Sequence, residues 1–240
     1  MINSQDNFDS NYDCFDEIRE NDNMIRVSHD NTPIKVVGIG GGAANSIEKM
    51  IENPYKGVEY CIINNNYVWN YNNLQEKATF MELVPTPSRF GDTPYRCKDT
   101  CDTLFYKSYD NDANKMAVYS LIDITTKYVI IVAGFGGIIG TAGTKWLSDI
   151  CKSLNIPVTV VCTIPFNFEG ERKQQRALDA VKTLEKSGIT VKAISAEDII
   201  EKHEDFNFFN SFSYLDEHVA EAVREICNRL EETTELYDPD

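Results

Sequence analysis

Two glycine-rich segments, each placed directly after a short apolar run, are the feature that most limits how this chain can fold. The first apolar run spans Ile34 to Ile39 and leads into the segment Gly38–Asn45. The second, Tyr128 to Ala133 (YVIIVA), leads into a segment with glycines at positions 134, 136, 137 and 140. Runs of this length and composition are typical of buried strands, and a helical pattern follows each glycine segment. Both segments therefore predict a strand–turn–helix unit, the building block of a parallel sheet.

The rest of the chain alternates between predicted strands and helices. Further strands are expected at residues 58–63, 79–84, 157–163 and 189–194. Helices are expected at residues 44–52, 113–125, 140–154, 171–186, 198–202 and 208–232. Such alternation predicts an α/β fold with three layers, in which a mainly parallel sheet carries helices on both faces. We expect residues 1–31 to form an acidic, flexible arm, residues 32–233 a nucleotide-binding domain that ends in the long last helix, and residues 234–240 a tail.

The 240 residues carry a formal net charge of −15. This charge argues against nucleic acids and anionic membranes as partners, because both require a basic face on the protein. No apolar stretch approaches the length of a membrane span and no signal-peptide pattern opens the chain, so we expect a cytoplasmic protein. The negative net charge repels a phosphate ligand, so backbone N–H groups and helix N-termini would have to supply most of the attraction.

Seven cysteines are scattered along the chain, and most are expected to be free thiols or small core residues, Cys151 and Cys162 among them. The tight pair Cys97 and Cys101 has no further Cys or His at ligand spacing nearby. We therefore expect a surface loop or a helix turn at this pair, and no metal site.

Glycine segments at the ends of strands suit a phosphate ligand. Backbone N–H groups can approach the phosphate oxygens there, and the following helix N-terminus adds partial positive charge. One such segment would fit a Rossmann-type dinucleotide-binding oxidoreductase, which stays open as an alternative. That fold wants an acidic residue after the next strand, however, where this chain has Asn64 to Asn66. A Walker loop would end in Lys followed by Ser or Thr, which Gly38–Asn45 lacks. Two segments instead predict a nucleotide whose phosphates are held from two strand ends.

Four short motifs, taken together, point to one known family. They are Gly38–Asn45, Gly136–Ala142, Pro165–Gly170 (PFNFEG) and Phe208–Asp216. In this order they resemble the first phosphate loop, the signature loop, the sugar-binding loop and the start of the central helix of the tubulin/FtsZ superfamily, and they are closest to FtsZ. The PFNFEG motif is the most specific of the four, and the resemblance covers about residues 34–232.

The resemblance implies a GTP or GDP ligand and a role for each matching residue. The first loop would line the phosphates and the base end of the pocket through Gly40, Gly41, Gly42 and Asn45. The second loop would cradle the β- and γ-phosphates through Gly136, Gly137, Gly140 and Thr141. Glu169 would accept from the ribose hydroxyls, and Lys173 stands where the family has an Arg. Phe212 would stack on the base, and Asp216 would accept from the guanine N1–H and amine, which adenine cannot match. Mg²⁺ would bind through the phosphates.

The same residues also have simpler interpretations, and the motifs depart from the family pattern. Phe212 lies among other aromatic residues and could belong to the core, and Asp216 could be a solvated helix residue. The signature loop has Ile138 and Ile139 where the family has Gly and Thr. The third phosphate loop, near Ser88–Asp92, is barely recognisable. These departures predict that the loops bind the phosphates differently from those of the family.

The sequence ends at Asp240, and we expect it to lack the paired acidic loop and second domain that follow the central helix in FtsZ and tubulin. In those families the loop of one subunit completes the GTPase site of its neighbour. The resemblance therefore implies a guanine-nucleotide-binding protein that hydrolyses GTP weakly or not at all when it is alone. It would be a GTPase if a partner subunit supplies the acidic loop. The partner would be an FtsZ-like protein or a second copy bound end to end. An alternative is a non-hydrolysing interaction protein that caps or regulates FtsZ-like filaments, and cell division as the process rests on the resemblance alone.

Overall fold

The computed structural model describes residues 34–65, 77–86, 101–200 and 210–235. The expected arm at residues 1–31, the segment Ser88–Asp92, Asn66 and Cys97 lie outside these ranges. Within them, the last helix runs to Glu235, two positions past the expected end of the domain at 233.

The centre of the fold is a six-stranded sheet in the order β3-β2-β1-β4-β5-β6, in which every pair of neighbours is parallel. The strands are β1 (Ile34–Ile39), β2 (Val58–Asn64), β3 (Thr79–Glu82), β4 (Tyr128–Gly134), β5 (Val158–Ile164) and β6 (Thr190–Ser195). From β1 the following strands β2 and β3 are added on one side, and from β4 the following strands β5 and β6 are added on the other side. Strands β1 and β4, where the direction reverses, are neighbours, with Ile39 opposite Ala133. Ligands of open α/β sheets bind at such a reversal, beyond the carboxyl ends of the strands. Both glycine segments begin there.

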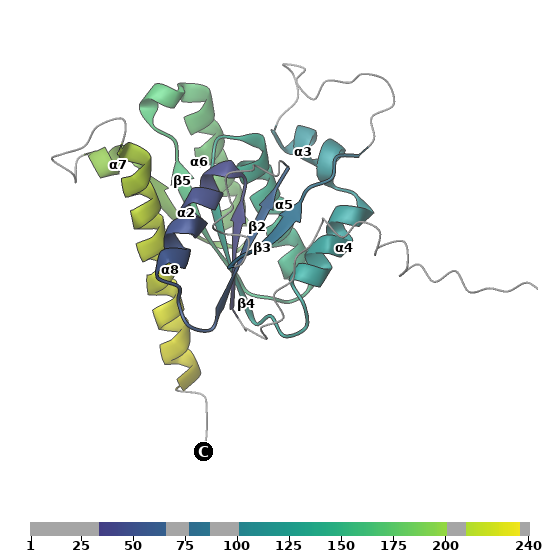
Figure 1. The fold of residues 1–240 in the computed structure, drawn as a ribbon. Helices are drawn as coiled ribbons and strands as arrows, with labels where there is room; N and C mark the ends of the chain where they lie inside the picture. Colours follow the sequence, from purple (N-terminus) through teal and green to yellow (C-terminus); the bar gives the residue numbers. More distant parts are fainter. Residues whose placement is uncertain (1–33, 66–76, 87–100, 201–209, 236–240) are drawn as a thin grey trace, which may run out of the picture.

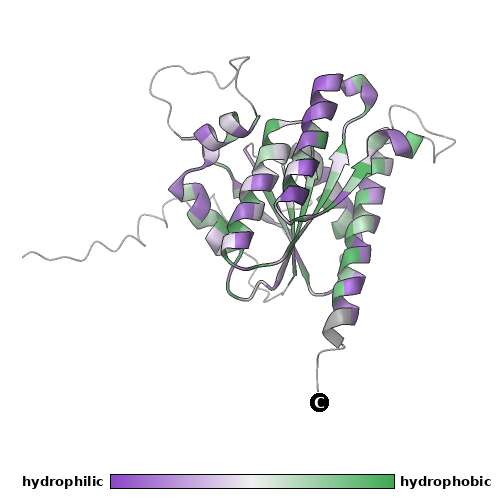
Figure 2. Ribbon diagram, turned by 180° about the vertical axis from the view of Figure 1, so that it is seen from behind, coloured by the Kyte–Doolittle hydropathy of each residue, from purple (hydrophilic) through white to green (hydrophobic). Residues whose placement is uncertain are grey.

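Helices cover both faces of the sheet, which confirms the predicted three-layer α/β fold (Figure 1). The helices are α2 (Gly41–Glu52), α3 (Cys101–Tyr109), α4 (Asp112–Leu121), α5 (Ile138–Ser153), α6 (Glu171–Lys186), α7 (Ala196–Ile200) and α8 (Ser211–Glu235). Alternate residues of a strand point to opposite faces. Thus Val36 belongs to the core that α2 and α8 cover, whereas Val37 belongs to the core that α3, α4, α5 and α6 cover. Figure 2 shows the apolar sheet enclosed by helices whose outer faces are polar.

The structure differs from the sequence predictions mainly between β3 and β4. A helix that was not predicted as a whole, α3, begins at Cys101, which agrees with the helix turn expected as one of the two interpretations of the cysteine pair. It places Cys101 and Phe105 in the core, so Cys101 does not lie on a surface loop. The predicted helix 113–125 ends at Leu121, because the Asp123 carboxylate accepts hydrogen bonds from Thr125 N and Oγ1 in a turn. The predicted core positions of Cys151 and Cys162 are confirmed, since both are fully buried.

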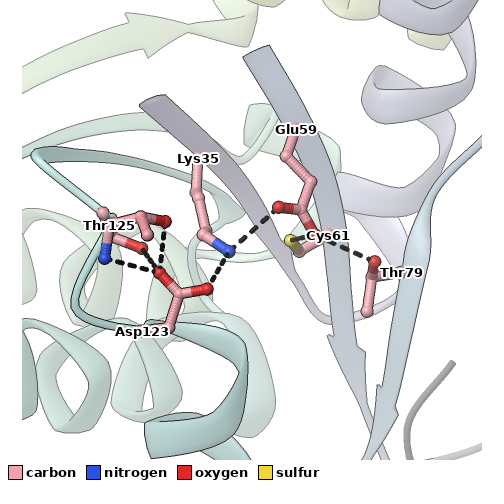
Figure 3. A network of polar contacts seen from close by, with 7 residues as sticks. Lys35, Glu59, Cys61, Thr79, Asp123 and Thr125 are labelled. Atoms are coloured by element: carbon pink, nitrogen blue, oxygen red, sulfur yellow. Dashed lines mark hydrogen bonds and ion pairs between the residues drawn. The ribbon is translucent and has the colours of Figure 1, made fainter. Parts of the chain in front are cut away.

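A buried ion pair lies near the amino ends of β1 and β2 (Figure 3), whereas the glycine segments follow the carboxyl ends of β1 and β4. Lys35 Nζ of β1 lies 2.9 Å from Glu59 Oε2 of β2, and both side chains are about 5% exposed or less. Thr79 Oγ1 donates to Glu59 Oε1 over 3.1 Å, and Asp123 Oδ2 lies 3.7 Å from Lys35 Nζ. These contacts join β1, β2, β3 and the turn before β4 at the end of the sheet that lies away from the glycine segments.

In the described part of the chain, no helix is long and apolar enough to cross a membrane.

Candidate functional site

Two helix N-termini open onto the crevice between β1 and β4. Gly40 is the N-cap of α2 and Gly137 is the N-cap of α5, and neither cap makes a side-chain hydrogen bond. Neither helix has an acidic residue in its first turn. The amides of a helix's first turn have no partner within the helix, and they carry the positive end of its dipole. The crevice can therefore attract an anion even though the whole chain is strongly acidic.

Two of the glycines lie so close to neighbouring backbone atoms that a Cβ would not fit without strain, Gly140 within the second loop and Gly40 where the two loops approach each other. A Cβ on Gly140 would lie 2.2 Å from the carbonyl oxygen of Gly134. A Cβ on Gly40, where φ is +83°, would lie 3.3 Å from the Gly140 nitrogen. In contrast, a Cβ on Gly41, Gly42 or Gly137 would meet nothing within 4 Å. Some glycines thus pack the loops together, while others leave open space above the helix starts.

A pocket of about 230 Å³ lies beside these loops. It brings together most of the residues proposed from the sequence: Gly42, Asn45, Gly137, Glu169, Lys173, Phe212 and Asp216. The others, Gly40, Gly41, Gly136, Gly140 and Thr141, do not line this pocket. The Thr141 side chain is buried, and its Oγ1 accepts from the Gly136 N–H over 2.9 Å. That hydroxyl holds the turn of the second loop.

The PFNFEG segment forms a short 3₁₀ turn, Asn167–Glu169, that supports one wall of the pocket. Phe166 N donates to Glu169 Oε1 over 3.1 Å, and Lys173 Nζ lies 3.3 Å from Glu169 Oε2. These contacts fix the carboxylate at the start of α6. The buried Phe166 ring anchors the turn, since it stacks on Phe168 with 4.9 Å between ring centroids.

Phe212 lies at the pocket on the first turn of α8, and it is not a core residue. The residue is 47% exposed, and its ring is nearly perpendicular to the Phe166 ring with the centroids 5.6 Å apart. A ring that one neighbour contacts in this way still has exposed surface that can pack against a planar ligand.

Asp216, one turn further along α8, is not a solvated surface residue either. Ser46 Oγ of α2 donates to Asp216 Oδ1 over 2.5 Å. Burial raises the pKa of the Asp216 carboxyl to about 6, against the hydrogen bond from Ser46 and the charge of Lys49, which lower it. A partly buried carboxylate with a raised pKa at a pocket wall is a typical feature of a ligand site.

Ile138 and Ile139 form the first two positions of α5. Both are partly buried and pack against the core on the side of α3 and α5. Ile139 Cβ would lie 3.7 Å from a Cβ on Gly40. The two branched side chains therefore pack toward the core at the start of α5, and Ile139 lies near the first loop.

Two contacts at the site were not foreseen from the sequence. Arg176 Nη1 donates to the Gly136 carbonyl over 2.6 Å, and so ties α6 to the second loop. The position of Arg176, three residues after Lys173, places both side chains on the same side of a helix, and this spacing could have suggested that Arg176 also lies at the site. Ser46 and Asp216 are separated by 170 positions, and no local pattern pairs residues at that distance.

The comparisons with known proteins agree with the geometry. No family model matches the chain. The chain is 26% identical to the cell division protein FtsZ of Porphyromonas gingivalis over 198 residues, which are 82% of this chain and 41% of that protein. It is 29% identical to FtsZ of Aquifex aeolicus over 201 residues, 81% of this chain and 51% of that protein. The chain thus spans about half the length of the curated relatives it matches.

Solved structures share the fold. An empty FtsZ dimer of M. jannaschii superimposes with a TM-score of 0.62 at 21% identity, over 88% of this chain and 57% of that one. A GTPγS-bound protofilament of CetZ2 from Haloferax volcanii gives a TM-score of 0.58 at 16% identity, over 79% of this chain and 56% of that one.

Proposed function

We propose that this chain, a tubulin/FtsZ superfamily protein by sequence and by fold, binds a guanine nucleotide in the pocket between its two glycine loops. One observation carries the proposal above the others. The free N-termini of α2 and α5, a half-exposed phenylalanine and a partly buried carboxylate surround a single pocket. Those groups match, in order, the phosphates, the flat base and its hydrogen-bonding edge.

Each part of the nucleotide has a proposed partner. Amides at the starts of α2 and α5 would hold the phosphates, above Gly41, Gly42 and Gly137, where the surface is open. Glu169 would accept from the ribose hydroxyls. Phe212 would pack on the base, and the Asp216 carboxylate would accept from the guanine N1–H and 2-amino groups. Adenine has no donor at N1, so Asp216 would select GTP or GDP over ATP.

The pocket is small for a complete nucleoside triphosphate, because ligand pockets usually measure about 300–1,000 Å³. The base and ribose would fill it, and the terminal phosphates would extend over the open helix starts. No cluster of His, Cys, Asp or Glu in the described part of the chain could hold a metal by itself. Mg²⁺ would therefore be held mainly by phosphate oxygens and water, as is usual for this ion at phosphate sites.

Hydrolysis is proposed to be weak or absent in the isolated chain. The carboxylates that line the pocket are Glu169 and Asp216, and both are already engaged by neighbouring groups. A group that activates water must be held next to it. We propose that a partner subunit, either an FtsZ-like protein or a second copy end to end, supplies that group. Relatives are named cell division proteins, and a cytoplasmic role in that process is proposed on this ground.

Displacement of a fluorescent GTP analogue by unlabelled nucleotides tests the proposal. GTP and GDP should compete at least about 100-fold better than ATP, since only guanine satisfies the carboxylate. NAD should compete no better than ATP. Equal competition by GTP and ATP would overturn guanine recognition, and stronger competition by NAD would support the oxidoreductase alternative instead.

A further inference from the structure

The hydroxyl of Ser46 is directed at the residue proposed to read the base. Ser46 lies on α2, is 3% exposed, and donates through Oγ to Asp216 Oδ1 on α8 over 2.5 Å. The two helices pack side by side against the same face of the sheet. Building on the proposed function, we infer that Ser46 is a positioning residue that sets guanine selectivity by orienting the Asp216 carboxylate and keeping it ionised.

Orientation matters because guanine presents two neighbouring donors. A carboxylate has about four lone-pair positions on its two oxygens, so Asp216 can accept from Ser46 and still accept from N1–H and the 2-amino group. The hydrogen bond from Ser46 removes the rotation of the carboxylate about its last bond. Without it, Asp216 would have to give up that rotational freedom when the nucleotide binds, which weakens binding.

Ionisation matters because only the charged carboxylate offers both oxygens as acceptors. The charged groups around Asp216 do not secure this state by themselves. Lys49 on α2 favours the charged form, while Glu217 on α8 and Glu48 on α2 oppose it. Lys49 is shared, since its Nζ also lies 3.3 Å from Glu52 and 3.7 Å from Glu217. Ser46 donates directly to the carboxylate, and this hydrogen bond stabilises the charged form that burial disfavours.

The substitution Ser46→Ala tests this role, with Ser148→Ala as a matched control. Ser148 is also a buried serine in a helix, but its Oγ has no hydrogen-bond partner. Ser46→Ala should weaken GTP binding about 5- to 10-fold and leave the weak binding of ATP unchanged, because ATP does not use Asp216. Ser148→Ala should leave both affinities unchanged, and Ser46→Thr, which keeps a hydroxyl, should retain more of the GTP preference than Ser46→Ala.

The pH profile gives a readout that general damage to the fold would not move. GTP affinity should fall below a pH set by Asp216, and Ser46→Ala should shift this midpoint to higher pH. An unchanged midpoint together with GTP affinity within twofold of the wild type would overturn the role of Ser46 alone. Equal losses for GTP and ATP would overturn it as well. A wild-type protein that does not distinguish GTP from ATP would overturn the proposed function, and the role of Ser46 with it.

Discussion

Gly40 and Gly140 lie so close that a Cβ added to Gly40 would be only 3.3 Å from the Gly140 nitrogen, so the two glycine loops approach each other closely at this point. The loops come from β1 and β4, strands that are neighbours in the sheet although many residues separate them in sequence. The close approach makes one site out of two helix starts. It also divides the glycines into those that hold the loops together and those that leave room above them.

This division predicts different outcomes for two similar substitutions. Gly140→Ala would place a Cβ 2.2 Å from the Gly134 carbonyl oxygen and should lower the free energy of unfolding by about 2–4 kcal/mol. Gly137→Ala meets no atom within 4 Å and has an ordinary φ of −91°, so the free energy of unfolding should fall by at most about 1 kcal/mol, the cost of placing Ala at a helix N-cap. Thermal denaturation of both variants measures the difference. Similar melting temperatures would contradict the close packing at Gly140.

The raised pKa of Asp216 gives stability and binding opposite dependences on pH. The folded protein binds a proton at this carboxyl more readily than the unfolded chain, since burial raises its pKa from the ordinary 3.8 to about 6. Lowering the pH from 7 to 4 should therefore stabilise the fold at this residue. GTP binding should weaken over the acidic part of the same range, below about pH 6, because the neutral acid loses an acceptor. Melting curves and GTP titrations between pH 4 and 8 measure both trends.

The substitution Asp216→Asn separates stability from recognition. Removing a partly buried charge should raise the melting temperature of the free protein at pH 7 by a few degrees. GTP affinity should fall, because the amide turns an N–H toward one of the guanine donors. Affinity for XTP should rise, because xanthine carries an oxygen where guanine carries the 2-amino group. A variant that is less stable and still prefers GTP would contradict both the burial cost and the base-reading role.

The ion pair between Lys35 and Glu59 should stabilise the fold without affecting the nucleotide site. Lys35→Met leaves Glu59 buried without its partner and should cost about 3–5 kcal/mol in urea denaturation. The double variant Lys35→Met, Glu59→Leu should recover most of this loss. Its GTP affinity should equal that of the wild type, because the pair lies near the amino ends of β1 and β2 and the pocket lies beyond the carboxyl ends of the strands. A double variant as unstable as the single one would show that the remaining contacts, from Thr79 and Asp123, are not replaceable.

Turnover measured across a wide range of protein concentration tests the proposed need for a partner. GTP hydrolysis by the chain alone should be slow and should rise in proportion to its concentration, because the pocket carboxylates are already engaged. Adding a filament-forming FtsZ should change the total turnover or the amount of polymer. A sharp concentration threshold with the chain alone would instead mean that its own copies complete the site.

Regular elements of this fold could be predicted closely where local chemistry defines them. Helix α6 runs over the predicted residues 171–186, because Gly170 at φ +105° precedes it and Gly188 at φ +79° follows it. The helix α3 was missed, although Cys101, Phe105 and Tyr109 have the four-residue spacing of a helix face. The spacing spans only two turns, which is too short to stand out beside a loop rich in proline.

The candidate site could be predicted in its parts and only partly in its arrangement. Motifs pointed to Glu169, Phe212 and Asp216 as single residues, and all three line the same pocket. The contact between Ser46 and Asp216 depends on how α2 packs against α8, which is a property of the folded sheet and not of any local sequence. The same holds for the close approach of Gly40 to Gly140.

Guanine recognition through Asp216 is tested most directly by calorimetric titration of GTP and ATP into the wild type and into Asp216→Ala. The wild type should bind one GTP per chain, with ATP at least about 100-fold weaker, and Asp216→Ala should bind GTP as weakly as ATP. The opposite result would be an Asp216→Ala protein that keeps the full preference for GTP, or a wild type that binds GTP and ATP equally. Either outcome would mean that the pocket between the glycine loops does not read guanine as proposed.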